Sequence, residues 1–290
     1  MESAVTELRK IGVIGAGTMG NGIAQTCAAA GFDVVMQDLS DAALARARKT
    51  MESSLARQVR KGTLTEAGAV ETLARVVTST EVTALADRDI VIEAIVEKIE
   101  VKAAIIAKLD GICREDAIFA SNTSSISLTE LAAASAHPGR VIGMHFFNPV
   151  PVMQLVEIIR ALQTTDPVAV AVTDLTHAIG KTPRVSKDSY GFIVNRLLAP
   201  QINEAINCVA EGLATPEDID SMMKLGANHP MGPLALGDLI GLDVVLNIME
   251  TLYNGFDDPK YRPSPLLKQM VAAGYLGRKT GKGFAEYHQT

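Results

Sequence analysis

The chain has 290 residues, of which 48% are hydrophobic and 21% charged, and its formal net charge is −6. This length suits one large domain or two modest ones, and this composition argues against a disordered chain. The acidic balance argues against a broad cationic surface for nucleic acid, and no apolar run reaches the ~18 residues of a membrane span. We therefore expect neither a nucleic-acid partner nor a membrane partner.

Three cysteines, Cys27, Cys113 and Cys208, show no metal-ligand spacing and lie in apolar or helical contexts. Free thiols are the simplest interpretation, and they favour a reducing compartment. The first ten residues carry acidic side chains and no apolar segment, unlike a secretory signal or a transit peptide. These features predict a cytoplasmic protein.

Short apolar runs alternate with helical stretches over the first two-thirds of the chain. The runs typical of strands are "KIGVIGA", "FDVVMQD", "ARVVTST", "DIVIEAI", "AIFASN", "VIGMHFF" and "LVEIIRA". Most of them are continuously apolar, as expected for strands that are covered on both faces. Helical stretches between them include 18–30, 41–61 and 96–109. This alternation predicts a Rossmann-type, doubly wound and mostly parallel α/β sheet.

From about Lys187 the patterns become helical, with little strand signal. Thr215, followed by Pro216 and acidic residues, is a helix start signal, and Gly226 is the matching stop signal. We therefore expect an α/β domain over residues 1–187 and an all-helical domain over residues 188–290.

The stretch "IGVIGAGTMG" places three glycines, Gly15, Gly17 and Gly20, in the spacing of a dinucleotide fingerprint. An apolar strand precedes it, a helical pattern follows, and Asp38 ends the next strand 18 residues after Gly20. The first glycine allows the tight turn, the second admits the pyrophosphate, and the third lets the helix pack on the strand. Asp38 would bind the adenine ribose and repel a 2′-phosphate, which favours NAD over NADP. Thr18 and Met19, which open the helix, complete the expected cofactor contacts of this loop.

His145 lies at the carboxyl end of a predicted strand, where ligands bind in open α/β sheets. Histidine is the usual proton carrier near neutral pH, and Glu157, in the middle of the next apolar strand, needs a buried partner. Either residue alone would more often be structural, but together they form a plausible acid/base pair. The serine-rich "SNTSS" (121–125) follows another strand end, where it is either a simple turn or a hydroxyl donor to a substrate. Likewise, Glu97 and Lys102 either line the cofactor cleft or occupy the solvated first turns of a helix.

Seven motifs along the chain are informative in their order and spacing. They are "GAGTMG", "EAIVE", "SNTSS", "HFFNPVP", "GFIVNRLL", "KLGANHPMGP" and "GRKTGKGF". Over residues 9–287 the chain resembles the short-chain L-3-hydroxyacyl-CoA dehydrogenase family. Within that family, its length is most similar to that of the bacterial 3-hydroxybutyryl-CoA dehydrogenases. The resemblance implies that His145 is the catalytic acid/base and Glu157 its orienting carboxylate. It implies that Ser124 and Asn195 bind the 3-oxygen of the substrate. Asn148 would position nicotinamide or substrate, and Glu97, Lys102 and Lys279 would contact the cofactor.

The helical stretch 41–61 carries Arg57, Arg60 and Lys61 on one face. Taken alone, such a basic face is most simply solvated. The resemblance implies that Ser54 and Lys61 contact coenzyme A, whose phosphates need local positive charge.

The implied reaction is the reversible, NAD-dependent oxidation of an (S)-3-hydroxyacyl-CoA, such as 3-hydroxybutyryl-CoA, to the 3-ketoacyl-CoA. One alternative is an L-gulonate 3-dehydrogenase of the lambda-crystallin type, and another is a non-catalytic NAD-binding protein. A third, the 3-hydroxyisobutyrate and 6-phosphogluconate group, uses a lysine-based site that lacks the histidine–glutamate pair. The apolar helices of 188–290 also favour a homodimer formed through that domain. No metal site is expected.

Overall fold

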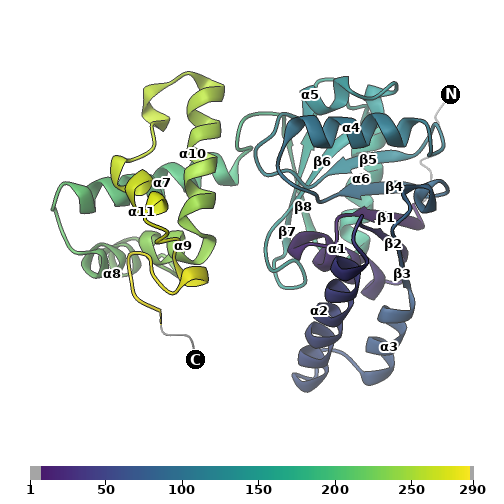
Figure 1. Ribbon diagram of the computed structural model, residues 1–290, viewed down its shortest axis with the longest axis horizontal. Coiled ribbons are helices and arrows are strands. Elements are labelled where there is room, and N and C mark those ends of the chain that lie inside the picture. Colours follow the sequence, from purple (N-terminus) through teal and green to yellow (C-terminus); the bar gives the residue numbers. More distant parts are fainter. Residues whose placement is uncertain (1–7, 288–290) are drawn as a thin grey trace. The chain divides into compact units, whose positions relative to one another are not determined.

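Two compact units make up the computed structural model, which describes residues 8–287 (Figure 1). Unit 1 spans Met1–Asp188 and unit 2 spans Ser189–Thr290. The prediction of a cytoplasmic protein drew on the first ten residues, and residues 1–7 of these lie outside the described part of the chain.

Unit 1 is built on an eight-stranded sheet with the order β3-β2-β1-β4-β5-β6-β7-β8. The strands are β1 Lys10–Ile14, β2 Asp33–Gln37, β3 Val76–Ser79, β4 Ile90–Glu93, β5 Ile118–Ser121, β6 Val141–Phe146, β7 Leu155–Arg160 and β8 Thr182–Lys187. The first six run parallel, β7 pairs antiparallel with β6, and β8 runs parallel to β7. The predicted doubly wound, mostly parallel sheet is confirmed.

Helices cover both faces of this sheet (Figure 1). They are α1 Thr18–Ala29, α2 Asp41–Arg60, α3 Glu66–Ala74, α4 Ile99–Asp110, α5 Leu128–Ala133 and α6 Asp166–Ala178, with 3-10 turns at Val82–Leu85 and Pro138–Arg140. Alternate strand residues such as Ile11 and Met144 share one core with α1, α2 and α6. The strand residues between these point to the opposite face of the sheet, where α5 packs. Gly143 is one of them, and a Cβ on it would lie 3.2 Å from Cγ of Leu128, the first residue of α5. Burial on both faces explains why the strands are continuously apolar.

The described part of unit 2 is built from helices, with two isolated β-bridges in its last segment. It contains α7 Val194–Ala210, α8 Pro216–Ala227, α9 Pro233–Ile240, α10 Leu242–Phe256 and α11 Pro265–Ala272, with 3-10 turns at Pro259–Tyr261 and Arg278–Thr280. Thr215 caps α8 as expected, since its side chain accepts a hydrogen bond from the Asp218 N–H. The expected stop at Gly226 is wrong: α8 runs to Ala227 and ends at the left-handed residue Asn228.

Two further boundaries differ from the sequence prediction. Strand β8 was not expected, because only Pro183 of its six residues is buried and its apolar signal is weak. Helix α4 begins at Ile99 rather than at 96, since the residues before it form the loop that carries Glu97. None of the helices in residues 8–287 combines the length and apolar character that crossing a membrane requires.

Candidate active site

The glycine loop between β1 and α1 has the backbone that its sequence predicts. Gly15 takes the left-handed conformation (φ +100°), and a Cβ there would lie 2.5 Å from the Ala94 carbonyl oxygen. A Cβ on Gly20 would collide with the carbonyl oxygen of Gly15, so only glycine lets the helix approach this closely. At Gly17, by contrast, a Cβ would meet nothing within 4 Å. The space beside Gly17 is therefore open to a group from outside the chain.

The loop also presents the groups that a dinucleotide requires. Gly17 is the N-cap of α1 and has no capping side chain, so the N–H groups of Thr18 and Met19 open the helix without one. A helix N-terminus of this kind favours phosphate. Asp38 follows β2, and its carboxylate accepts hydrogen bonds from the Ala16 N–H (2.8 Å) and the Ser40 N–H (3.0 Å). These residues fit the pyrophosphate and adenine ribose of NAD.

His145 and Glu157 are paired across β6 and β7. The antiparallel register sets them directly opposite each other, so both side chains lie on the same face of the sheet. Nδ1 of His145 lies 2.7 Å from Oε2 of Glu157, and both residues are buried. The ring of Phe147 lies 4.5 Å from the imidazole. With Nδ1 engaged by the carboxylate, Nε2 is the ring nitrogen suited to exchange a proton with a substrate.

The loop after β5 is organised by the carboxylate of Glu97, which lies between β4 and α4. Glu97 Oε1 accepts hydrogen bonds from Thr123 Oγ1 (2.5 Å), the Ser124 N–H (2.9 Å), Ser125 Oγ (3.3 Å) and Ser124 Oγ (3.4 Å). Burial raises the pKa of Glu97, but the Lys102 ammonium and these hydrogen bonds outweigh it and hold the pKa below its ordinary value. The carboxylate therefore stays ionised beside Ser124 at neutral pH.

Lys102 is a buried residue of α4, so the alternative that placed it in a solvated helical turn is wrong. Its side chain is 1% exposed, and its ammonium lies 2.6 Å from Glu93 Oε1 and 3.2 Å from Glu97 Oε2. The sequence reasoning did not single out Glu93 as a site residue. The signal was available, because a charged residue at the end of an apolar strand is the same kind of feature that drew attention to Glu157.

A further hydrogen bond joins the loop after β5 to the end of β6. Asn122 Oδ1 accepts from the Phe146 N–H at 2.9 Å, which fixes the loop beside the residue that follows His145. Asn148 lies in the exposed turn two residues after β6. Within unit 1 the fold thus gathers the glycine loop, Asp38, Glu97, Ser124 and His145 at the carboxyl ends of its parallel strands.

Two expected site residues belong to unit 2. Asn195 lies in the first turn of α7, and Lys279 lies in the 3-10 turn Arg278–Thr280. The Lys279 ammonium is paired with the carboxylate of Asp243, at 2.5 and 2.7 Å from its two oxygens. The proposed roles of both residues stay predictions.

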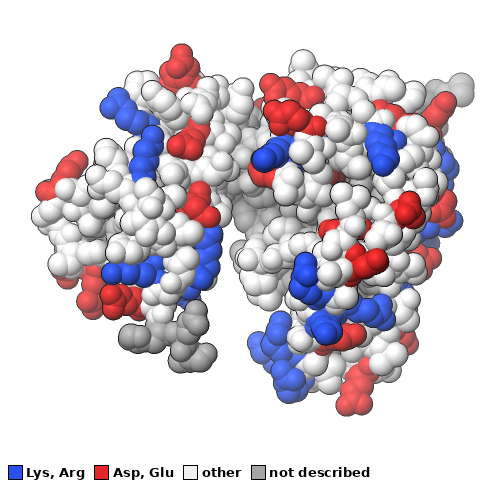
Figure 2. All heavy atoms as spheres, viewed as in Figure 1, with Lys and Arg blue, Asp and Glu red and all other residues white. Residues whose placement is uncertain are grey.

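Helix α2 carries several exposed basic side chains. Its basic residues, all exposed, are Arg46, Arg48, Lys49, Arg57 and Arg60, with Lys61 following as the C-cap. Figure 2 shows Lys and Arg side chains gathered at the end of α2 that lies farthest from the sheet. Ser54 is half-buried on this helix, and its hydroxyl accepts a hydrogen bond from Gln25 Nε2 of α1 at 3.1 Å.

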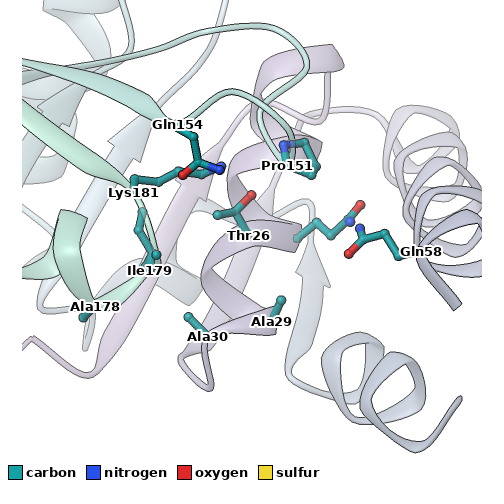
Figure 3. A pocket seen from close by; sticks show the side chains of 11 residues that line it. Thr26, Ala29, Ala30, Gln58, Pro151, Gln154, Ala178, Ile179 and Lys181 are labelled. Atoms are coloured by element: carbon teal, nitrogen blue, oxygen red, sulfur yellow. The ribbon is translucent and has the colours of Figure 1, made fainter. Parts of the chain in front are cut away.

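A pocket of about 390 Å³ lies in unit 1 between α1, α2 and the segments that lead into β7 and β8 (Figure 3). Gln58, one turn after Ser54, lines the pocket, and its side chain points toward α1. Lys181 forms another wall, and its ammonium donates to the carbonyl oxygens of Val150 (2.7 Å) and Met153 (2.8 Å). None of the expected site residues lines this pocket.

Known proteins share both the sequence and the architecture of the chain. It is 54% identical over 278 residues to a probable 3-hydroxybutyryl-CoA dehydrogenase of Deinococcus radiodurans, covering 96% of this chain and all of the relative. It is 52% identical over 280 residues to a 3-hydroxybutyryl-CoA dehydrogenase of Bradyrhizobium diazoefficiens, covering 97% of this chain and 96% of the relative. The crystal structure of an (S)-3-hydroxybutyryl-CoA dehydrogenase from Ralstonia eutropha matches 97% of this chain and all of its own, with 56% identity and a TM-score of 0.94.

Family models give the same assignment for each part of the chain. The model for the NAD binding domain of 3-hydroxyacyl-CoA dehydrogenase matches residues 10–189, and the model for its C-terminal domain matches residues 191–287. The resemblance noted from the motifs is confirmed, and so are NAD as the cofactor and an oxidoreductase as the class of enzyme. The chain belongs to the 3-hydroxyacyl-CoA dehydrogenase family.

Proposed function

We propose that this protein catalyses the reversible, NAD-dependent oxidation of (S)-3-hydroxybutyryl-CoA and related 3-hydroxyacyl-CoA substrates to 3-ketoacyl-CoA. The observation that carries the proposal is the buried His145–Glu157 pair at the sheet edge that also carries the glycine loop. The names of the similar proteins support 3-hydroxybutyryl-CoA as the substrate.

The side chains of the site have separate roles in proton transfer and in stabilising the charge that develops. His145 Nε2 takes the proton of the 3-hydroxyl, and the Glu157 carboxylate on Nδ1 stabilises the imidazolium that results. Ser124 and Asn195 donate hydrogen bonds to the 3-oxygen as negative charge develops on it. NAD, when bound, accepts the hydride from the same carbon. Asn148, Glu97, Lys102 and Lys279 keep the positioning or cofactor-contacting roles that the family resemblance implies.

Helix α2 offers a surface for coenzyme A. We assign Ser54 and Lys61 to this contact, and the exposed arginines and lysines of α2 support it because coenzyme A carries several phosphate charges. A local basic patch of this kind reconciles the net charge of −6 with a polyanionic substrate.

We further propose a homodimer formed through unit 2, in the cytoplasm, with a role in fatty-acid metabolism. Large apolar side chains exposed on unit 2 support the dimer. The three free cysteines support a reducing compartment.

The decisive test replaces the proton carrier. We expect His145→Gln to lower kcat for acetoacetyl-CoA reduction by at least about 100-fold, the contribution typical of general acid–base catalysis, without loss of NADH binding. The control is His177→Gln, which changes an exposed histidine on α6 and should leave kcat unchanged. Full activity of the His145 variant would overturn the assignment. Turnover of L-gulonate in place of acetoacetyl-CoA would favour the sugar-acid alternative.

A further inference from the structure

Strand β4 ends on a buried acid that the proposed mechanism does not use. Glu93 is 2% exposed, and both of its carboxylate oxygens accept hydrogen bonds. Oε1 accepts from Lys102 Nζ (2.6 Å) and from the Ile95 N–H (2.8 Å), while Oε2 accepts from Ser121 Oγ (2.7 Å). A carboxylate as deeply buried as this one is tolerated because every donor around it is aligned.

Lys102 shares its single positive charge between two carboxylates. Its Nζ lies 2.6 Å from Glu93 and 3.2 Å from Glu97, which approach it from the end of β4 and from the loop that follows. Glu93 is the nearer and more deeply buried partner. It therefore keeps the ammonium from moving closer to Glu97.

The position of Glu97 in turn determines the loop that carries Ser124. Oε2 of Glu97 faces Lys102, while Oε1 accepts from Thr123 Oγ1 and from the Ser124 N–H. The hydroxyl of Ser124 lies 3.4 Å from the same oxygen, the longest of these contacts. Because the backbone N–H of Ser124 is bonded to Glu97, the hydroxyl that the proposed function directs to the substrate oxygen moves with that carboxylate.

These contacts close into a ring. Glu93 bonds to Lys102, Lys102 to Glu97, and Glu97 to the hydroxyl of Thr123. The N–H of Thr123 donates to Ser121 Oγ (3.2 Å), which donates back to Glu93. The segment 121–125 is thus held at its first residue by Glu93 directly, and at its middle by Glu93 through Lys102 and Glu97.

We propose that Glu93 is a positioning residue for hydride transfer: through Lys102 and Glu97 it sets the place of the Ser124 hydroxyl. The proposal rests on the proposed function, because it takes Ser124 as the donor to the 3-oxygen. Because Glu93 is 2% exposed, we assign it a role that acts through these neighbours and not through contact with a ligand. In a Glu93→Gln protein the Lys102 ammonium is left with Glu97 as its one carboxylate. The ammonium then draws Glu97 away from Thr123 and Ser124.

The test measures chemistry and loop order separately. We expect Glu93→Gln to lower kcat for acetoacetyl-CoA reduction at least tenfold, since a misplacement on the order of 1 Å costs about 100-fold, with KM changed less than kcat. NADH deuterated at the transferred position should give a larger isotope effect on kcat, because hydride transfer becomes slower relative to product release. In the protein without ligands, the amides of residues 121–126 should exchange hydrogen faster than in wild type.

Two further variants keep the test decisive. Asp110→Asn removes another ion-paired carboxylate of unit 1, at the last residue of α4, and should lower stability without changing kcat or exchange in 121–126. Ser121→Ala leaves Glu93, Lys102 and Glu97 in place and removes the hydroxyl that donates to Glu93 and accepts from the Thr123 N–H. If Glu93→Gln does not fold, Ser121→Ala should still show a lower kcat and faster exchange.

The outcomes also separate this proposal from the proposed function. Exchange in 121–126 and kcat that both match wild type in a folded Glu93 variant would overturn the positioning role. An equal effect of Asp110→Asn on kcat would overturn it too, because the loss would then follow stability. A wild-type protein that turns over no 3-ketoacyl-CoA would instead contradict the proposed function, and exchange would still report whether Glu93 orders the loop.

Discussion

At the scale of single residues, Asp110 ends α4 with its carboxylate bonded to Arg140, Ser135 Oγ (3.0 Å) and the Ala136 N–H (2.7 Å). Its side chain is 11% exposed and that of Arg140 is 6% exposed. Burial raises the pKa of Asp110, but the hydrogen bonds and the Arg140 charge outweigh it and hold the pKa below its ordinary value. The carboxylate therefore contributes to folding only while it is ionised.

The pH dependence follows from the direction of this shift. A lowered folded-state pKa means that the unfolded chain binds the proton more tightly, so stability is full above the ordinary value of about 3.9 and falls as pH drops below it. We expect Asp110→Asn to lower the free energy of unfolding by about 3–5 kcal/mol at pH 7, because it leaves Arg140 buried without its anion. The difference from wild type should shrink below pH 4, as seen in unfolding midpoints at pH 7 and pH 3. A difference that stays constant over this range would contradict the assignment, and exposed Asp174→Asn serves as the control.

The site could be predicted from the sequence wherever a residue was unusual for its element. His145 was indicated by its place at the carboxyl end of a strand, and Glu157 by its charge inside the apolar strand "LVEIIR". The need to pair a buried charge then joined the two. Lys102 could not be placed in this way, because a lysine in the first turn of a helix is ordinarily solvated. Its burial depends on Glu93 and Glu97, two acids that only the β4–α4 connection brings together.

At the scale of elements, the turn from β1 to α1 offers two glycines with opposite requirements. A Cβ on Gly20 would strike the Gly15 carbonyl, whereas a Cβ on Gly17 would meet nothing within 4 Å. The backbone of Gly17 (φ −71°, ψ −171°) is one that alanine also adopts. Gly20 is therefore required by the packing of the fold, whereas Gly17 leaves room for a ligand at the helix N-terminus.

This contrast predicts different defects for the two alanine variants. Gly17→Ala should fold with an unchanged melting temperature and bind NADH at least about tenfold more weakly, since the methyl group occupies the approach of the pyrophosphate. Gly20→Ala should melt at a lower temperature even without cofactor, because the helix must shift to relieve the collision. Calorimetry of the ligand-free proteins and NADH titration by fluorescence measure both properties. Equal stability of the two variants would contradict the division of roles.

The order of strands β1 to β7 was predictable because helices cover both faces of the sheet. Most of these strands are therefore apolar on both sides and stand out as apolar runs in the sequence. The exception, β8, lies at the sheet edge with mostly exposed residues, so its pattern resembles a loop. In unit 2 the stretch "GDLIGLDVVLNIMETLYN" has one continuous helical pattern, yet Gly241 (φ +105°) divides it into α9 and α10. A single glycine in an apolar pattern does not reveal whether the chain turns there.

At the scale of the whole molecule, the proposed homodimer requires an apolar surface on unit 2 that a second copy can cover. Several large apolar side chains of unit 2 are about half or more exposed: Leu197, Leu213, Met222, Leu225 and Leu239. Met222 and Leu225, at 62% and 88% exposed, are three residues apart on α8 and so share one face of that helix. Apolar residues gathered on one exposed helical face are typical of a surface that another chain covers.

We therefore expect the protein to have about twice its chain mass of 30.7 kDa in light scattering coupled to size exclusion. The double substitution Met222→Glu and Leu225→Glu should yield monomers with unchanged circular dichroism, because two charges of the same sign would have to be buried without partners. Leu162→Glu is the matched control, since Leu162 is equally exposed (88%) but lies in unit 1, and it should leave the mass unchanged. A monomeric wild type would contradict the homodimer. A dimer that survives the double substitution would place the interface on a surface other than α8, because an interface that includes this face cannot accommodate both charges.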